Sequence, residues 1–161
     1  MAAEERRAAE KARRDETRRL EKLAEEERKA KKREREAVKR ARAIEEYHSR
    51  WKDLLEEANQ PHATERQLRF EDIPWPIYPV PDELGEGHFS KEAVSTFLLV
   101  NKDEDRKRRK EILRETFLRF HPDKFEGRFM RRVVEEEKAR VREAIGQISR
   151  VLNHLLEDNT N

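Results

Sequence analysis

The sequence predicts an all-α protein, and three observations support this fold class. Residues 2–36 contain little besides Ala, Glu, Lys and Arg, which all form helices readily. Apolar residues recur at steps of three and four from residue 37 to 58 and again from 134 to 155. Prolines are concentrated in one segment between these stretches, where a regular helix cannot continue. We therefore expect a long helix over about residues 3–58, an extended segment, and helices near 90–99, 103–120 and 129–157.

The composition limits how much of the chain can share one hydrophobic core. Of the 161 residues, 34% are hydrophobic and 46% are charged, which is too polar for a core that involves the whole length. Basic and acidic residues are interleaved, so the formal net charge is only +2. Binding to a polyanion therefore cannot be argued from net charge.

The sequence also argues against a secreted or membrane protein. It has no cysteine, so neither a disulfide scaffold nor a thiolate metal site is available. No apolar run approaches the ~20 residues that span a bilayer, and the N-terminus lacks the apolar region of a signal peptide. We expect an intracellular protein without membrane contact.

We assign residues 1–58 to one charged helix that becomes amphipathic from about residue 37. Acid-to-base pairs at four-residue spacing, such as Glu10–Arg14 and Glu27–Lys31, each stabilise such a helix by roughly 0.2–0.5 kcal/mol. The first part has no repeating apolar seam, so we expect a solvated single helix there rather than a coiled coil. The second part has an apolar face, on which Trp51 is expected to anchor the helix to the rest of the domain.

Residues 59–89 form a proline-rich segment that we call the strap. Its prolines favour an extended course, yet it also carries many large apolar side chains that a free linker does not need. We expect the strap to lie across helices with Phe70, Ile73 and Trp75 inserted between them. The five prolines are Pro61, Pro74, Pro76, Pro79 and Pro81.

Residues 90–157 are expected to form a helical domain, followed by a polar tail at 158–161. Ser90 is a good N-cap for the first helix, and Asn101 with Glu104 resembles a capping box for the second. The second helix has an apolar side that includes Phe117 and Phe120, and its other side is basic. Pro122 should end it near residues 120–121 and leave His-Pro-Asp on a turn.

A His-Pro-Asp tripeptide at the end of a basic amphipathic helix, with a second long amphipathic helix after it, resembles the J-domain. Hsp40-type co-chaperones engage Hsp70 through this module. The resemblance implies a J-domain-like helical hairpin with an exposed His-Pro-Asp loop. It also implies an Hsp70-binding surface made of His121, Pro122, Asp123, Arg106, Arg109, Lys110, Arg114 and Lys124.

A second motif narrows the resemblance. The segment RFEDIPWPI, at residues 69–77, precedes the helix end RFHPDKF by some forty residues. This arrangement is similar to the C-terminal part of NF-kappa-B inhibitor-like proteins and to related fungal J-like proteins. The similarity extends over roughly residues 45–157.

The sequence shows no catalytic or ligand-binding constellation. Its five histidines, at positions 48, 62, 88, 121 and 154, fall in different elements, and none has neighbours that complete a metal-ligand set. No glycine-rich phosphate-binding loop occurs. We expect a non-enzymatic protein without a cofactor, a metal or a small-molecule substrate.

Two function classes remain. The first is a J-domain-like module that recruits or regulates an Hsp70-type chaperone through the basic helix and the His-Pro-Asp loop. The alternative is a nuclear scaffold or a component of an RNA or protein complex that keeps a degenerate J-like fold only as architecture. The basic runs at 29–35 and 106–110 suit nuclear import or phosphate contacts, although both also suit solvated helix faces. They favour the nucleus over the cytoplasm.

Overall fold

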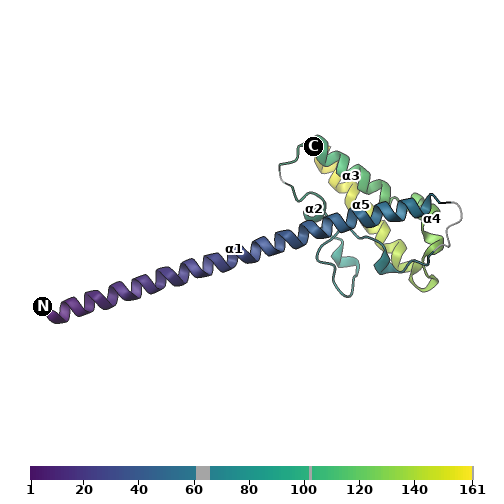
Figure 1. Cartoon of the computed structure of the whole chain (residues 1–161). Helices are drawn as coiled ribbons and strands as arrows, with labels where there is room; N and C mark the ends of the chain where they lie inside the picture. Colours follow the sequence, from purple (N-terminus) through teal and green to yellow (C-terminus); the bar gives the residue numbers. More distant parts are fainter. Residues whose placement is uncertain (61–65, 102, 161) are drawn as a thin grey trace. The chain divides into compact units, whose positions relative to one another are not determined.

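The computed structural model describes residues 1–60, 66–101 and 103–160, and it divides into two compact units, Met1–Arg42 and Ala43–Asn161 (Figure 1). The described part is all-helical and contains no strand, which confirms the predicted fold class. The α-helices are α1 (Ala2–Ala58), α2 (Lys91–Leu98), α3 (Arg106–Phe120), α4 (Pro122–Arg128) and α5 (Lys138–Thr160). Short 3-10 helices are η1 (Phe70–Asp72), η2 (Glu86–His88), η3 (Met130–Arg132) and η4 (Glu135–Glu137). Pro61, His62 and Asn161, which entered the sequence-based predictions, lie outside the described residues.

The first unit is a single stretch of helix with solvent-exposed side chains. Leu20 and Leu23, the only large apolar residues between positions 2 and 36, are both about half exposed. The predicted ion pairs Glu10–Arg14 and Glu27–Lys31 are present at 3.9 and 3.3 Å. None of the buried core residues belongs to this unit. Its helix is therefore stabilised by high helix propensity and by ion pairs of this kind. No helix in the described residues is long and apolar enough to cross a membrane.

The second unit is built on an antiparallel pair of helices, α3 and α5, which lie side by side in Figure 1. At one end, the Asn159 side chain donates a hydrogen bond to the carbonyl of Arg106 at the start of α3. At the other end, Arg142 of α5 pairs with Glu126 of α4 at 2.5 Å. The apolar faces of both helices supply the core residues Leu113, Phe120, Val141, Ile145, Ile148 and Leu152.

The C-terminal part of α1 and the strap complete this core. Trp51 is fully buried, and its indole Nε1–H donates to the carbonyl oxygen of Pro74 in the strap at 2.9 Å. Trp75 donates from Nε1 to the carbonyl of Phe70, also at 2.9 Å, so the strap folds back on itself. Both tryptophans pack against Phe120, with ring centroids 5.1 and 6.0 Å away. The strap is therefore an integral part of the domain.

The last helix begins later than the sequence predicts. A helix was expected over 129–157, but α5 runs from Lys138 to Thr160. The strap causes the late start: the backbone N–H of Leu68 donates to the Arg132 carbonyl, and the N–H of Val134 donates to the Leu68 carbonyl. This isolated parallel bridge between Leu68 and Val133 holds the chain extended where a helix would need those groups.

The other helix boundaries show how local capping decides a start. The Ser90 hydroxyl accepts a hydrogen bond from the backbone N–H of Ala93, as its predicted N-cap role requires. The predicted capping box at Asn101 and Glu104 does not form. Instead, Asp105 caps α3 by accepting from Arg108 N–H at 2.8 Å, so the helix begins at Arg106 rather than near residue 103.

Replacing Trp75 tests whether the strap stabilises the domain. We expect Trp75→Ala to lower the free energy of unfolding by about 3–5 kcal/mol, because it empties a well-packed site that is 5% exposed. Urea denaturation followed by circular dichroism measures this loss. Val80→Ala in the same strap is the matched control and should change the free energy by less than about 0.5 kcal/mol, since Val80 is exposed. Equal, small effects of both substitutions would mean that the strap is a free linker.

Candidate protein-interaction site

The His-Pro-Asp tripeptide forms a junction between two helices rather than a turn. His121 is at once the C-cap of α3 and the N-cap of α4, with extended backbone angles φ −64° and ψ 123°. Pro122 occupies the first position of α4, where its fixed φ suits a helix and its missing N–H costs nothing. The sequence-based prediction of His-Pro-Asp on a turn is therefore wrong, because a second helix begins at Pro122 and continues through Gly127.

Three consecutive side chains at this junction point away from the core. Pro122, Asp123 and Lys124 are exposed, whereas Phe120 before them and Phe125 after them are almost completely buried. The two buried phenylalanines fix the backbone on either side. The exposed residues 122–124 are therefore held in place although their own side chains do not enter the core. Preorganisation of this kind lowers the entropic cost of binding a partner.

His121 itself is only half-buried, and its ring packs edge-on against Phe117 at a centroid distance of 5.5 Å. Its Nδ1 atom is buried and has no hydrogen-bond partner among the described residues. The side chain makes no capping hydrogen bond at α4. The ring is thus positioned by packing against α3, not by a local hydrogen bond.

The predicted basic residues of α3 separate into two groups. Lys110 and Arg114 lie on the same helix face as His121, at three- and four-residue steps, together with Lys107. These three cations form no ion pair within the described part of the chain. We call Lys107, Lys110 and Arg114 the basic stripe. Lys107 was not among the site residues predicted from the sequence. Its three-residue spacing from Lys110 on a helix was the signal that could have identified it.

The remaining predicted cations lie elsewhere. Arg106 is exposed at the start of α3, and Arg109 is half-buried with its Nε atom enclosed and unpaired. Arg109 shares the face of Leu113 and Thr116 that points into the domain. Arg119, a further basic residue of α3, has a side chain only 10% exposed that pairs with Glu115 at 3.0 Å. It belongs to the packing between α1 and α3.

Arg119 sets the electrostatics of this packing. Its guanidinium lies 5.5 Å from the ring centroid of Tyr47 and 5.9 Å from that of Trp51, within cation–π range. Burial raises the pKa of the Tyr47 hydroxyl to about 12, although the nearby Arg119 cation acts in the opposite direction. Burial and then the same cation lower the pKa of His48.

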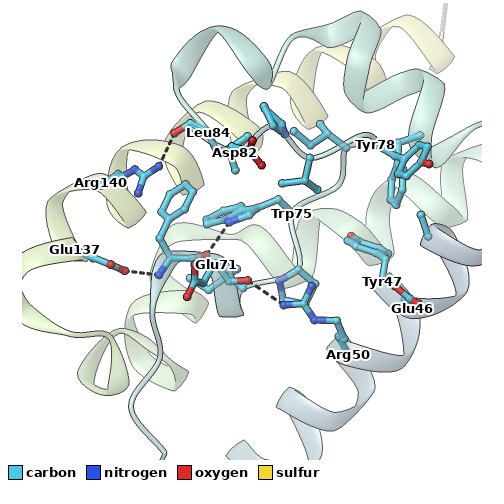
Figure 2. A pocket seen from close by; sticks show the side chains of 18 residues that line it. Glu46, Tyr47, Arg50, Glu71, Trp75, Tyr78, Asp82, Leu84, Glu137 and Arg140 are labelled. Carbon is cyan, nitrogen blue, oxygen red and sulfur yellow. Dashed lines mark hydrogen bonds between the residues drawn. The ribbon is translucent and has the colours of Figure 1, made fainter. Parts of the chain in front are cut away.

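A second feature, which the sequence did not predict, is a groove of about 380 Å³ between α1, the strap and the start of α5. Figure 2 shows Trp75 inside it, with Tyr47 and Arg50 from α1 to one side and Arg140 from α5 to the other. Only the tertiary structure brings these elements together, so no local pattern could have indicated it. The described residues contain no group of three or more His, Cys, Asp or Glu side chains placed to hold a metal ion.

Comparison with known proteins adds one finding. Residues 92–160 match the family model of the NF-kappa-B inhibitor-like protein 1 C-terminal domain. The match takes in α3, α4 and α5 and therefore the whole of the His-Pro-Asp junction, whereas the strap and α1 precede it. It confirms the predicted resemblance at the level of this C-terminal domain. No curated protein and no solved structure matches the chain.

The raised pKa of Tyr47 predicts a loss of stability at alkaline pH. Below pH 10 the tyrosine is protonated in both the folded and the unfolded chain. As the pH rises from 10 to about 12, the unfolded chain releases this proton first, so the free energy of unfolding falls. Tyr47→Phe keeps the ring and removes the proton, so it should lose less stability over this interval. Urea denaturation at pH 8 and pH 11 measures both proteins, and an identical decline would show that Tyr47 does not contribute.

Proposed function

We propose that the unit from residue 43 onward is a non-catalytic interaction module that binds an Hsp70-type chaperone through the His-Pro-Asp junction and the basic stripe. The observation that carries the proposal is the continuity of the two features. Lys107, Lys110 and Arg114 run along one face of α3 and lead to His121 and the exposed side chains that follow it. The similarity of this arrangement to a J-domain supplies the class of partner.

The charge of the surface favours an acidic partner. The acidic neighbours on α3 are already occupied: Glu111 contacts Arg108 at 3.3 Å, and Glu115 contacts Arg119 at 3.0 Å. The cations of the basic stripe have no such partner in the described part of the chain. Exposed charges of one sign steer association and make it sensitive to salt.

The surface is also separate from the core, which suits a binding role. Asp123 and Lys124 are exposed, and neither takes part in an ion pair among the described residues. Asp123 lies in the first turn of α4, where its carboxylate complements the positive end of the helix and stays accessible. A partner can therefore contact these groups without any rearrangement of the fold.

The test is stimulation of ATP hydrolysis by a purified Hsp70. We expect Asp123→Asn to abolish the stimulation and to leave the urea midpoint unchanged, because an exposed, isosteric change costs little packing energy. Lys107→Glu with Arg114→Glu should weaken binding by roughly tenfold at low salt, and the difference from the wild type should shrink as salt is added. Lys52→Glu with Arg150→Glu is the charge-matched control at two exposed positions outside the stripe.

Two outcomes would contradict the proposal. The first is a wild-type chain that stimulates no Hsp70, together with a His121→Gln variant that unfolds at lower urea concentration. His121 would then serve only as a helix-end clamp against Phe117. The second is an equal loss of binding in the stripe variant and in the control, which would indicate unspecific charge attraction.

A different observation favours a second candidate function, contact with RNA through the first unit. Residues 28–42 contain nine Lys or Arg and two Glu, a net charge of +7, whereas residues 2–27 are nearly balanced. Arg28, Lys32, Arg35, Lys39 and Arg42 recur at steps of three and four and share one helix face over about 21 Å. A straight row of cations of this length is suited to several successive phosphates.

Fluorescence anisotropy with a labelled 20-nucleotide oligouridylate tests this candidate. We expect the full chain to bind with a logarithmic salt slope of about −3, as four or five phosphate contacts to a single strand would give. A chain that begins at Ala43 should lose this binding and keep its cooperative unfolding, because the core residues all follow residue 42. Retention of the RNA by the shortened chain would exclude the first unit as the contact.

A further inference from the structure

The groove beside Trp75 combines an apolar interior with acidic edges. Its interior is formed by buried side chains that include Tyr47, Ile73 and Trp75. Val80 also lines it and is 56% exposed, so part of this apolar surface faces solvent. A volume of about 380 Å³ is sufficient for one or two aliphatic side chains of a bound segment.

Two arginines line the groove and donate hydrogen bonds to backbone carbonyls of the strap. Arg50 donates from Nη2 to the backbone carbonyls of Glu71 and Asp72, at 3.1 and 3.0 Å. Arg140 donates to the carbonyl of Leu84 at 2.6 Å and lies 3.9 Å above the Phe70 ring. The strap is thereby fixed to α1 at Glu71 and to α5 at Leu84, as the dashed lines in Figure 2 show. The groove is preformed.

The carboxylates around the groove outnumber these two arginines, four to two. Glu46, Glu71 and Asp82 are exposed, line the groove, and form no ion pair within the described residues. Glu137 also lines it, although its carboxylate accepts the backbone N–H of Phe70 and lies 3.9 Å from Arg69. Four carboxylates and two guanidiniums give the groove a net charge of −2. An apolar interior with this charge at its edge is complementary to apolar side chains flanked by cations.

We infer that this groove binds an extended peptide segment of a partner protein, in which one or two aliphatic residues are flanked by Lys or Arg. The aliphatic side chains enter beside Trp75 and Val80, and the cations face Glu46, Glu71 and Asp82. This surface is distinct from the His-Pro-Asp junction and does not rest on the proposed chaperone binding. It gives the domain a second docking site of opposite charge.

The experiment uses the full chain labelled with ¹⁵N and a capped synthetic hexapeptide, acetyl-Arg-Arg-Leu-Ile-Arg-Arg-amide. The chain has two tryptophans, and only Trp75 lines the groove, so the two indole N–H signals act as an internal comparison. We expect the peptide to shift the Trp75 signal in a saturable way while the Trp51 signal stays in place. The shift should decrease when 0.5 M salt is added, since screening weakens exposed charge contacts.

Matched peptides and variants decide between occupants. Two control peptides, acetyl-Glu-Glu-Leu-Ile-Glu-Glu-amide and acetyl-Arg-Arg-Gly-Ser-Arg-Arg-amide, should bind the wild-type chain at least about tenfold more weakly. The Glu71→Arg/Asp82→Arg variant should bind acetyl-Arg-Arg-Leu-Ile-Arg-Arg-amide at least about tenfold more weakly than the wild type does. Asp53→Arg/Glu56→Arg makes the same change in charge on exposed positions of α1 outside the groove and should bind normally. Each of three results would overturn the inference: no shift at Trp75, equal binding of the acidic peptide, or equal weakening by the groove and control variants.

Discussion

The hydrogen bond from the Trp51 indole to the Pro74 carbonyl joins α1 to the strap at the point where Trp51 also packs against α3. Trp51 comes from α1, Pro74 from the strap, and the Trp51 ring packs on Phe120 of α3 at 5.1 Å. All three residues are buried. A buried indole N–H without a partner would cost about 1–3 kcal/mol, so the strap must supply this carbonyl wherever the helix docks. The strap is therefore a structural part of the domain. Together with α1 it adds buried apolar residues to the α3–α5 pair, which would have too small a core on its own.

This arrangement also explains why the charged residues of α3 have different roles. Docking of α1 against one side of α3 covers Arg119 with the rings of Tyr47 and Trp51. The opposite side remains open, and Lys107 and Arg114 stay exposed there. The basic residues of α3 therefore fall into two groups. One group supports the packing against α1, and the other remains exposed to solvent. Only the second group belongs to the proposed binding surface.

The sequence was sufficient for α1, α2, α3, the greater part of α5, and the strap with its buried aromatic residues, because periodicity and proline content are local signals. It failed where the partner in a hydrogen bond is distant in the sequence. Leu68 holds residues 132–134 extended, and the expected helix from 129 therefore begins at Lys138. Pro122 was interpreted as a helix stop, yet it also starts α4, since a proline suits the first position of a helix. The groove depends on three separated elements, so no stretch of sequence could show it.

Two stacked rings connect the groove with the His-Pro-Asp junction through the core. Trp75, which lines the groove, stacks on Phe120 at 6.0 Å with an angle of 20° between the planes, and Phe120 directly precedes His121. Removing either ring would disturb both surfaces at once, so a core substitution cannot assign a function to one of them. The exposed carboxylates of the groove and the exposed cations of α3 lie outside this stack. Because side chains on different surfaces with no shared contacts act independently, reversing their charges would separate the two proposed binding activities while the common core stays intact.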